Sequence, residues 1–146
     1  MKISAKTRYG VRLMLELALN HGKGLLFLKE IAKRQEISEK YLSQIIIPLK
    51  AKGLIASGRG AYGGYMLTKN PSEITLKDII ETLEGDITLV GCAANPAICK
   101  RAPLCASRDV WVMLADKISE AFSSIDLEDL VKMHKAKEEK VAIYNI

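Results

Sequence analysis

Apolar side chains recur at helical spacing between residues 37 and 51. Four of them follow the i, i+3, i+4, i+7 spacing of one buried helical stripe: Leu42, Ile45, Ile46 and Leu49. Ser38 precedes this helix and can cap it through its hydroxyl. A shorter helix is predicted over residues 28–34, and the polar residues Gln35 and Glu36 form a tight break between the two. The pattern is typical of a helix-turn-helix.

Three side chains point away from the apolar stripe of the second helix: Lys40, Tyr41 and Gln44. They lie in its first turns, where a helix-turn-helix protein presents side chains to base edges. Gln44 suits adenine, Lys40 suits guanine or phosphate, and Tyr41 suits phosphate or a thymine methyl. Ser38 belongs to the same expected DNA-binding set. Pro48 is expected to bend or shorten the last turns, at about 3 kcal/mol unless packing offsets it.

Two short strands are predicted next, over residues 54–57 and 65–68, and four of the seven residues between them are glycine. This linking segment carries one guanidinium, that of Arg59. A flexible hairpin tip with one positive charge suits insertion into a narrow, electronegative minor groove. The alternative is that the glycines only supply positive φ angles and Arg59 is a solvated charge. The position directly after a helix-turn-helix favours a DNA-contacting wing.

A first helix is predicted over residues 5–20, capped by Ser4. Six apolar residues form its buried face: Val11, Leu13, Met14, Leu15, Leu17 and Ala18. Arg8, Arg12 and Glu16 are expected to share the opposite side at i, i+4 spacing.

A further helical stripe follows the wing and closes the core: Leu76, Ile79, Ile80 and Leu83. Thr75 and Asp78 fit a capping pattern at its start, and Gly85 ends it.

A longer helix is predicted from Asp109 to about residue 123. Its apolar positions advance by three, four, three and four: Trp111, Leu114, Ile118, Ala121 and Ile125. Such a seam suits pairing with a second copy of the chain, and packing on its own domain is the alternative. Asp126 then caps a short helix through about residue 133, and residues 135–146 are expected to form a charged, mobile tail.

The charge is unevenly distributed along the 146 residues. Residues 1–70 hold 13 Lys and Arg against 4 Asp and Glu, a net +9, whereas residues 71–146 hold 9 against 13, a net −4. A basic first half indicates nucleic-acid binding through phosphate neutralisation. No apolar run approaches the roughly 18 residues that span a bilayer, and no signal-peptide segment is recognisable. We therefore expect a cytoplasmic protein without a membrane partner.

All three cysteines lie within residues 91–108: Cys92, Cys99 and Cys105. Two prolines, Pro96 and Pro103, keep this segment irregular, so that three sulfurs can converge from a loop. An odd number of clustered cysteines favours a soft metal centre over a disulfide framework. The spacing is wider than that of zinc-binding pairs and fits an iron-sulfur cluster. The alternative is that the cysteines are small apolar residues with only a packing role.

These stretches together resemble a known family. The segments KISAKTRYGVRLMLELAL, ISEKYLSQI and GLIASGRGAYGGYML, with the cysteine segment, are similar to the IscR, NsrR and CymR family of bacterial winged-helix transcription regulators. The resemblance runs over about residues 1–131. It implies that Lys6 and Tyr9 contact the DNA backbone, that the dimer forms through the long helix, and that Cys92, Cys99 and Cys105 bind a 2Fe-2S or 4Fe-4S cluster.

The fourth cluster ligand departs from the family pattern. Where relatives have a histidine three residues after the third cysteine, this chain has Arg108, and where others have an acidic residue in the first helix it has Arg8. A guanidinium does not bind iron. The open candidates are Asp109, Glu16, His21, His134, an external thiol or water. A 4Fe-4S cluster on three cysteines leaves one iron open, so cluster type stays undecided.

We expect a mainly α fold with a small β-wing: a winged helix-turn-helix domain plus a long C-terminal dimerisation helix. Residues 1–86 would bind DNA, residues 87–108 would hold the cluster, residues 109–134 would dimerise and residues 135–146 would form the tail. The predicted function is a homodimeric regulator, such as a repressor, that binds an inverted repeat and senses cluster status, redox state or nitric oxide. A cluster-free thiol or partner-dependent regulator is the alternative, and an iron-sulfur carrier module comes third. No catalytic constellation emerges, so we predict no enzyme.

Overall fold

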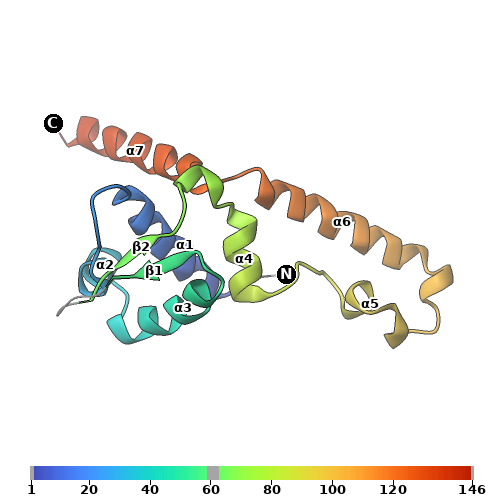
Figure 1. Ribbon diagram of the computed structural model, residues 1–146. Helices are drawn as coiled ribbons and strands as arrows, with labels where there is room; N and C mark the ends of the chain where they lie inside the picture. The colour runs from blue at the N-terminus through green and yellow to red at the C-terminus, as the bar shows by residue number, and fades with distance from the viewer. Residues whose placement is uncertain (1, 59–62, 146) are drawn as a thin grey trace.

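The computed structural model describes residues 2–58 and 63–145, and the statements below refer to them. The first half of the chain forms a helical layer with a two-stranded sheet at its edge (Figure 1). Its elements are α1 Ala5–Leu19, α2 Leu28–Gln35, α3 Glu39–Ala51, β1 Ile55–Ser57, β2 Tyr65–Leu67, η1 Pro71–Glu73 and α4 Leu76–Glu84. The predicted helices and the antiparallel hairpin are thus confirmed.

The helix-turn-helix forms for local reasons. Ser38 is the N-cap of α3, and its hydroxyl accepts a hydrogen bond from the Tyr41 amide at 3.1 Å. Glu36 has a φ of 55°, and this left-handed residue ends α2 and turns the chain. The predicted stripe of α3 is fully buried. α3 continues past Pro48 to Ala51, so the proline does not end the helix.

The core lies between α1, α2, α3, the sheet and α4. Its most deeply buried members come from all of these elements and include Leu13, Met14, Ile31, Leu42, Ile45, Leu49, Ile55 and Ile79. Burial of each such side chain contributes about 1.5–3 kcal/mol. In the sheet, Ile55 pairs with Leu67 and Ser57 with Tyr65, and a bridge from Leu26 to Tyr65 joins the sheet to the loop before α2.

The face of α1 is rotated from the predicted one. Leu13 and Leu17 lie at the centre of the buried face, whereas Val11 and Leu15 are half-buried. The prediction that Glu16 lies opposite the core is wrong, because its side chain is buried against α2, where Arg34 and Gln35 bind it.

The start of α1 is tied to the end of α4. The Ser4 amide donates to Glu84 at 2.8 Å, and the Ser4 hydroxyl accepts from the Thr7 amide at 3.2 Å. Hydrogen bonds from the side chains of Ser4 and Thr7 hold the pKa of the Glu84 carboxyl below its usual value. The predicted caps at Ser4 and at Thr75 are both confirmed, since Thr75 and Asp78 form a reciprocal capping box.

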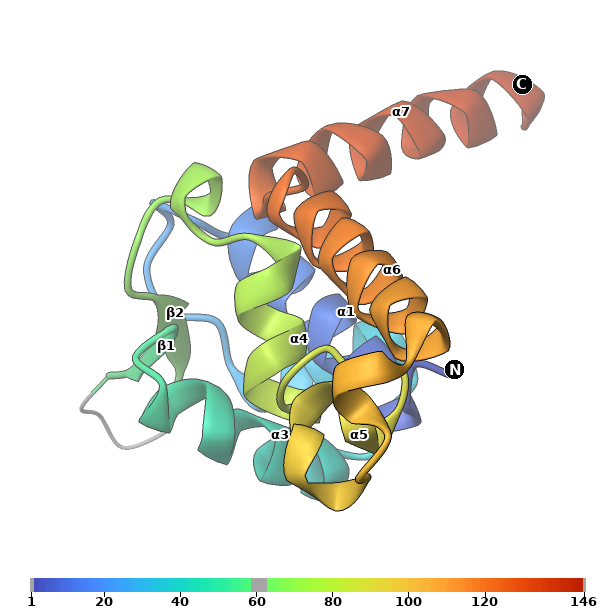
Figure 2. The same cartoon turned by 90° about the vertical axis from the view of Figure 1, so that its right-hand side faces the viewer.

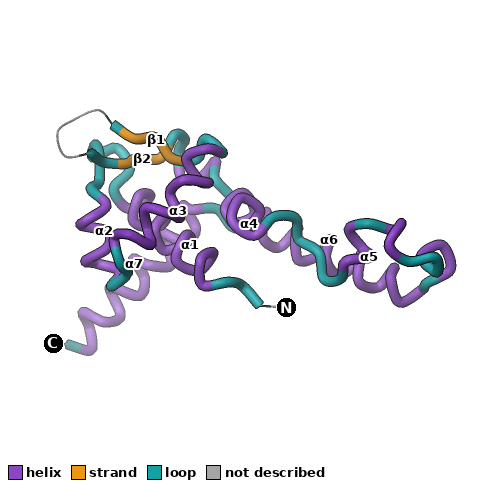
Figure 3. The backbone as a smooth tube through the Cα atoms, turned by 90° about the horizontal axis from the view of Figure 1, so that it is seen from below, coloured by secondary structure: helices purple, strands orange, loops and turns teal. Residues whose placement is uncertain are grey.

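Much of the second half of the chain lies outside this layer. This half contains α5 Gly91–Ala94, η2 Pro96–Ile98, η3 Ala102–Leu104, α6 Ala106–Ser123 and α7 Leu127–Tyr144. The start of α7 packs against α1, and its Leu127 is fully buried in the core. Figure 2 shows α6 running beside α4, and Figure 3 shows α5 at the end of the molecule farthest from the β-hairpin. The junction between α6 and α7 is anchored on α4, since the Leu76 amide donates to the Ile125 carbonyl at 2.7 Å.

The C-terminal helix is longer than predicted. α7 runs without interruption from Leu127 to Tyr144, and it includes most of the segment that was expected to be a mobile tail. Its capping box is formed by Asp126 and Asp129, and the pair of His134 and Glu138 at 3.0 Å lies on its exposed second half. None of the described helices has the length and apolarity needed to cross a membrane.

Candidate nucleic-acid interface and cysteine segment

The outward face of α3 carries the side chains best placed to meet DNA. Lys40 and Gln44 are exposed and lie one turn apart, as the sequence predicts. Ile47 continues the same row one turn further on and is 67% exposed. Ile47 was not predicted from the sequence, although its spacing of three from Gln44 is the signal that places it on this face. The row offers one cation, one amide and one apolar group, and the last suits a thymine methyl.

Tyr41 does not point away from the core as predicted. Its ring is half-buried and packs edge-on against the Tyr9 ring of α1, with 5.7 Å between centroids. The Arg12 guanidinium lies over the Tyr9 ring, 5.4 Å from its centroid. These two tyrosines join α1 to the first turn of α3, so the main role of their rings is packing between the two helices.

The other predicted DNA contacts are spread over three elements. Lys6 is exposed in the first turn of α1, and Ser38 is exposed at the N-cap of α3. Arg59, the guanidinium predicted for the wing tip, lies outside the described residues. The base of the hairpin is held against α3, because the Lys50 ammonium donates to the Ser57 hydroxyl at 2.7 Å. DNA contact by these residues stays a prediction.

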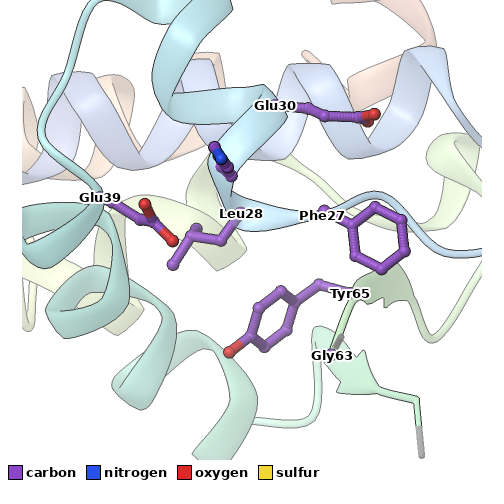
Figure 4. A pocket seen from close by; sticks show the side chains of 7 residues that line it. Phe27, Leu28, Glu30, Glu39, Gly63 and Tyr65 are labelled. Carbon is purple, nitrogen blue, oxygen red and sulfur yellow. The ribbon is translucent and has the colours of Figure 1, made fainter. Parts of the chain in front are cut away.

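A groove of about 550 Å³ separates the start of α2 from β2 (Figure 4). Its wall includes the rings of Phe27 and Tyr65 and the side chain of Leu28. The Glu39 side chain reaches toward Leu28 from the first turn of α3. Two carboxylates line this groove, those of Glu30 and Glu39, and they outnumber the one ammonium, that of Lys29. The groove itself is therefore a poor site for the DNA backbone.

The three cysteines are free thiols at the joints of short helical turns. Cys92 lies in α5, Cys99 follows η2, and Cys105 caps α6. All three are half-buried. The segment is therefore built from short turns rather than the irregular loop that was predicted. Pro96 is the first residue of η2 and Pro103 is the second residue of η3.

Arg108 holds the two ends of the cysteine segment together. Its Nε donates to the Cys92 carbonyl at 2.9 Å, and its amide donates to the Cys105 sulfur at 3.4 Å. The side chain at the position where the sequence analysis looked for a fourth ligand thus makes a structural contact.

The arrangement does not assemble a metal site. Among the described residues, no three Cys, His, Asp or Glu side chains are grouped closely enough to hold a metal ion. Three of the candidate fourth ligands have other partners, since Glu16 pairs with Arg34, His21 with Asn70 and His134 with Glu138. Three thiols are the right donors for an iron-sulfur cluster, yet this conformation does not bring them together.

Comparison with known proteins decides the family. Residues 3–133 match the Rrf2 family, which is described as an iron-dependent transcriptional regulator. This chain belongs to the Rrf2 family. CymR of Bacillus subtilis is 42% identical over 144 residues, which is 99% of each chain. IscR of Photorhabdus laumondii is 37% identical over 131 residues, 90% of this chain and 79% of that relative.

Solved structures agree with this Rrf2 assignment. The structure of B. subtilis CymR, described as the global cysteine regulator, matches with a TM-score of 0.77 and 43% identity over 91% of this chain and 98% of that chain. The structure of T. potens IscR matches with a TM-score of 0.74 and 38% identity over 92% and 88%. The predicted winged-helix fold is confirmed, and the chain is a DNA-binding transcription regulator and not an enzyme.

Proposed function

We propose that this Rrf2 protein is a homodimeric repressor that reads an inverted-repeat promoter site in the cytoplasm with the exposed face of α3. The row of Lys40, Gln44 and Ile47 carries this proposal, because it is an exposed face on the second helix of the helix-turn-helix that offers hydrogen-bonding and apolar groups for base edges. The net +9 of residues 1–70 supplies the phosphate attraction that such binding needs.

The second copy would pair through α6. Four large apolar side chains near its start remain exposed in the single chain: Val110 at 43%, Trp111 at 38%, Met113 at 51% and Leu114 at 37%. The neighbouring side of the same helix, which carries the buried Ala115, packs against its own domain. An apolar face of this kind on a projecting helix supports an isologous dimer, in which both copies contribute the same surface.

The cysteine segment is the proposed sensor. Cys92, Cys99 and Cys105 provide soft thiolate ligands for an iron-sulfur cluster, and the resemblance to IscR supports this. Residues 91–105 would then have to adopt an arrangement other than the present one, and Arg108 would have to leave the Cys92 carbonyl or hold it in a new position. A bound cluster would supply redox and ligand-exchange chemistry.

A cluster-free sensor is the second candidate. The absence of a grouped ligand set among the described residues favours it, as does the 99% coverage of a CymR protein. In that case the three half-exposed thiols respond to oxidation directly, or a partner protein carries the signal.

Anaerobic purification of the protein distinguishes the cluster-binding sensor from the cluster-free one. A cluster predicts visible charge-transfer absorption with matching iron and acid-labile sulfide, and replacement of any one cysteine by Ala is expected to abolish or destabilise it while the protein stays folded. Full iron content in all three single variants would refute the ligand assignment. A colourless protein that stays iron-free after anaerobic reconstitution would establish the cluster-free regulator.

DNA binding is tested independently of the sensor. The protein is used to select duplexes from a random-sequence pool, and the selected site is expected to be an inverted repeat with half-sites about one helical turn, or a multiple of it, apart. Selection of no sequence above the random background would contradict the proposed function.

A further inference from the structure

Glu16 is the most deeply buried carboxylate among the described residues, with 6% of the residue exposed. Its Oε1 accepts a hydrogen bond from the Gln35 side-chain amide at 2.6 Å, and its Oε2 pairs with Arg34 at 3.3 Å. Gln35 is the last residue of α2, so both partners lie at the end of that helix, just before the turn. The carboxylate thus joins the middle of α1 to the entry of the helix-turn-helix turn.

The contacts continue from Gln35 to the recognition helix. Arg12 donates from Nε to the Gln35 side-chain oxygen at 2.7 Å and from a second nitrogen to the Gln35 carbonyl. The same guanidinium lies over the ring of Tyr9, and Tyr9 packs against Tyr41 in the first turn of α3. An unbroken series of contacts therefore runs from Glu16 to the helix that bears Gln44.

The network is fully satisfied. In the part of the chain that the structure describes, no buried side-chain nitrogen or oxygen lacks a hydrogen-bond partner. Removing a carboxylate from water is costly, and its ion pair recovers that cost only in part, so such a pair adds little net stability compared with apolar packing. What a satisfied polar network does fix is the relative orientation of the elements that it joins.

We propose that Glu16 is a positioning residue for DNA recognition. Through Gln35 and Arg34 it sets the end of α2, and through Arg12, Tyr9 and Tyr41 it sets the first turn of α3 against α1. This inference rests on the proposed function, since it assumes that Gln44 reads a base. It also assigns Glu16 a role within its own chain in place of the iron-ligand role considered from the sequence.

A double-mutant cycle tests the coupling. Affinity for the selected duplex is measured for the wild type, Glu16→Gln, Gln44→Ala and the double variant at one salt concentration. Gln keeps the size of the side chain and removes the charge that holds Arg34. We expect Gln44→Ala to weaken specific binding about tenfold or more in the wild type and by less than about threefold in the Glu16→Gln background, because a misplaced helix no longer delivers Gln44 to its base.

Two controls keep this result specific. Glu139→Gln makes the same change in net charge on the exposed end of α7, and it is expected to leave the effect of Gln44→Ala unchanged. Binding to a random duplex, which depends on phosphate contacts, should differ less than about twofold between Glu16→Gln and Glu139→Gln. Circular dichroism confirms that each variant is folded, and Glu16→Asp, which keeps the charge, replaces Glu16→Gln if that variant does not fold.

The outcomes distinguish the two proposals. An equal loss from Gln44→Ala in both backgrounds would overturn the positioning role of Glu16 and leave the proposed function standing. If Gln44→Ala has no effect even in the wild type, the recognition face itself is wrong, and the positioning role falls with it.

Discussion

Gln44 and Lys40 are neighbours on α3 and should have different effects on DNA binding. Gln44 offers a paired donor and acceptor to a base edge, so Gln44→Ala is expected to cost about 1–3 kcal/mol at the selected site and to relax specificity at one base position. Lys40→Ala should weaken binding by a similar factor for all sequences. It should also reduce, by about 1, the slope of the logarithm of the binding constant against the logarithm of the salt concentration. Fluorescence anisotropy with selected and random duplexes over a salt series measures both effects. Identical behaviour of the two variants on both duplexes would contradict base readout by Gln44.

The Glu84 carboxylate makes stability depend on pH. The pKa of Glu84 is lowered in the folded protein by hydrogen bonds with Ser4 and Thr7 at the start of α1. A lowered folded-state pKa adds stability above the ordinary pKa of a glutamate, and this contribution is lost as pH falls through the folded-state value. Glu84→Gln should therefore be slightly less stable than the wild type at neutral pH and equal to it in acid. Urea unfolding at several pH values measures the difference in free energy of unfolding between the two proteins. A difference that grows as the pH falls would contradict the stabilising role of the ionised Glu84.

Helix caps show what a single element contributes. The Thr75 hydroxyl accepts from the Asp78 amide at 3.1 Å, and Asp78 accepts from the Thr75 amide at 2.9 Å. Thr75→Ala is expected to lower the free energy of unfolding by about 1 kcal/mol. Thr88→Ala, at an exposed position outside the helices, is the matched control and should change it little. Chemical denaturation measures both, and equal losses would show that the cap does not matter here.

Features that depend on residues within one helix could be predicted from the sequence. Features that depend on contacts with another helix could not. The stripe of Leu42 to Leu49 and the cap at Thr75 follow from residues within one helix, and both are present. The burial of Glu16 depends on Arg34 and Gln35, which lie on another helix. The charged residues after Lys135 indicate a solvated segment but do not reveal that α7 continues to Tyr144.

The same distinction holds for the candidate site. Lys40 and Gln44 were found because helical periodicity places them opposite the buried stripe. Tyr41 was misjudged because its ring finds Tyr9 on α1, a contact that spacing within α3 cannot show. The spacing of the cysteines indicates soft ligands but not how the segment folds around Arg108.

At the scale of the whole molecule, the proposed dimer would pair through the outer face of α6. Leu114→Asp places a charge in the apolar seam and is expected to give a monomer, because an unpaired buried carboxylate is costly. Asp116→Lys changes the charge at an exposed position of the same helix that is not one of the four apolar residues of this face, and it should leave the dimer intact. Sedimentation velocity measures both. A Leu114→Asp protein that remains a dimer would move the interface away from this face.

Loss of the dimer should carry over to DNA binding. A monomer contacts one half-site, so Leu114→Asp is expected to bind the selected duplex far more weakly than Asp116→Lys does. In a dimer, binding of one recognition helix to its half-site holds the second helix close to the other half-site. The second contact therefore forms at a high effective concentration, which a monomer lacks.

The most direct test of the account is a hydroxyl-radical footprint of the wild-type protein on its selected duplex. A dimer that inserts α3 of each copy into the major groove predicts two equivalent protected half-sites, related by two-fold symmetry and about one helical turn, or a multiple of it, apart. In the Gln44→Ala protein, protection should weaken at both half-sites together. A single protected patch, or protection that is the same on random DNA, would contradict the proposal that α3 reads an inverted repeat.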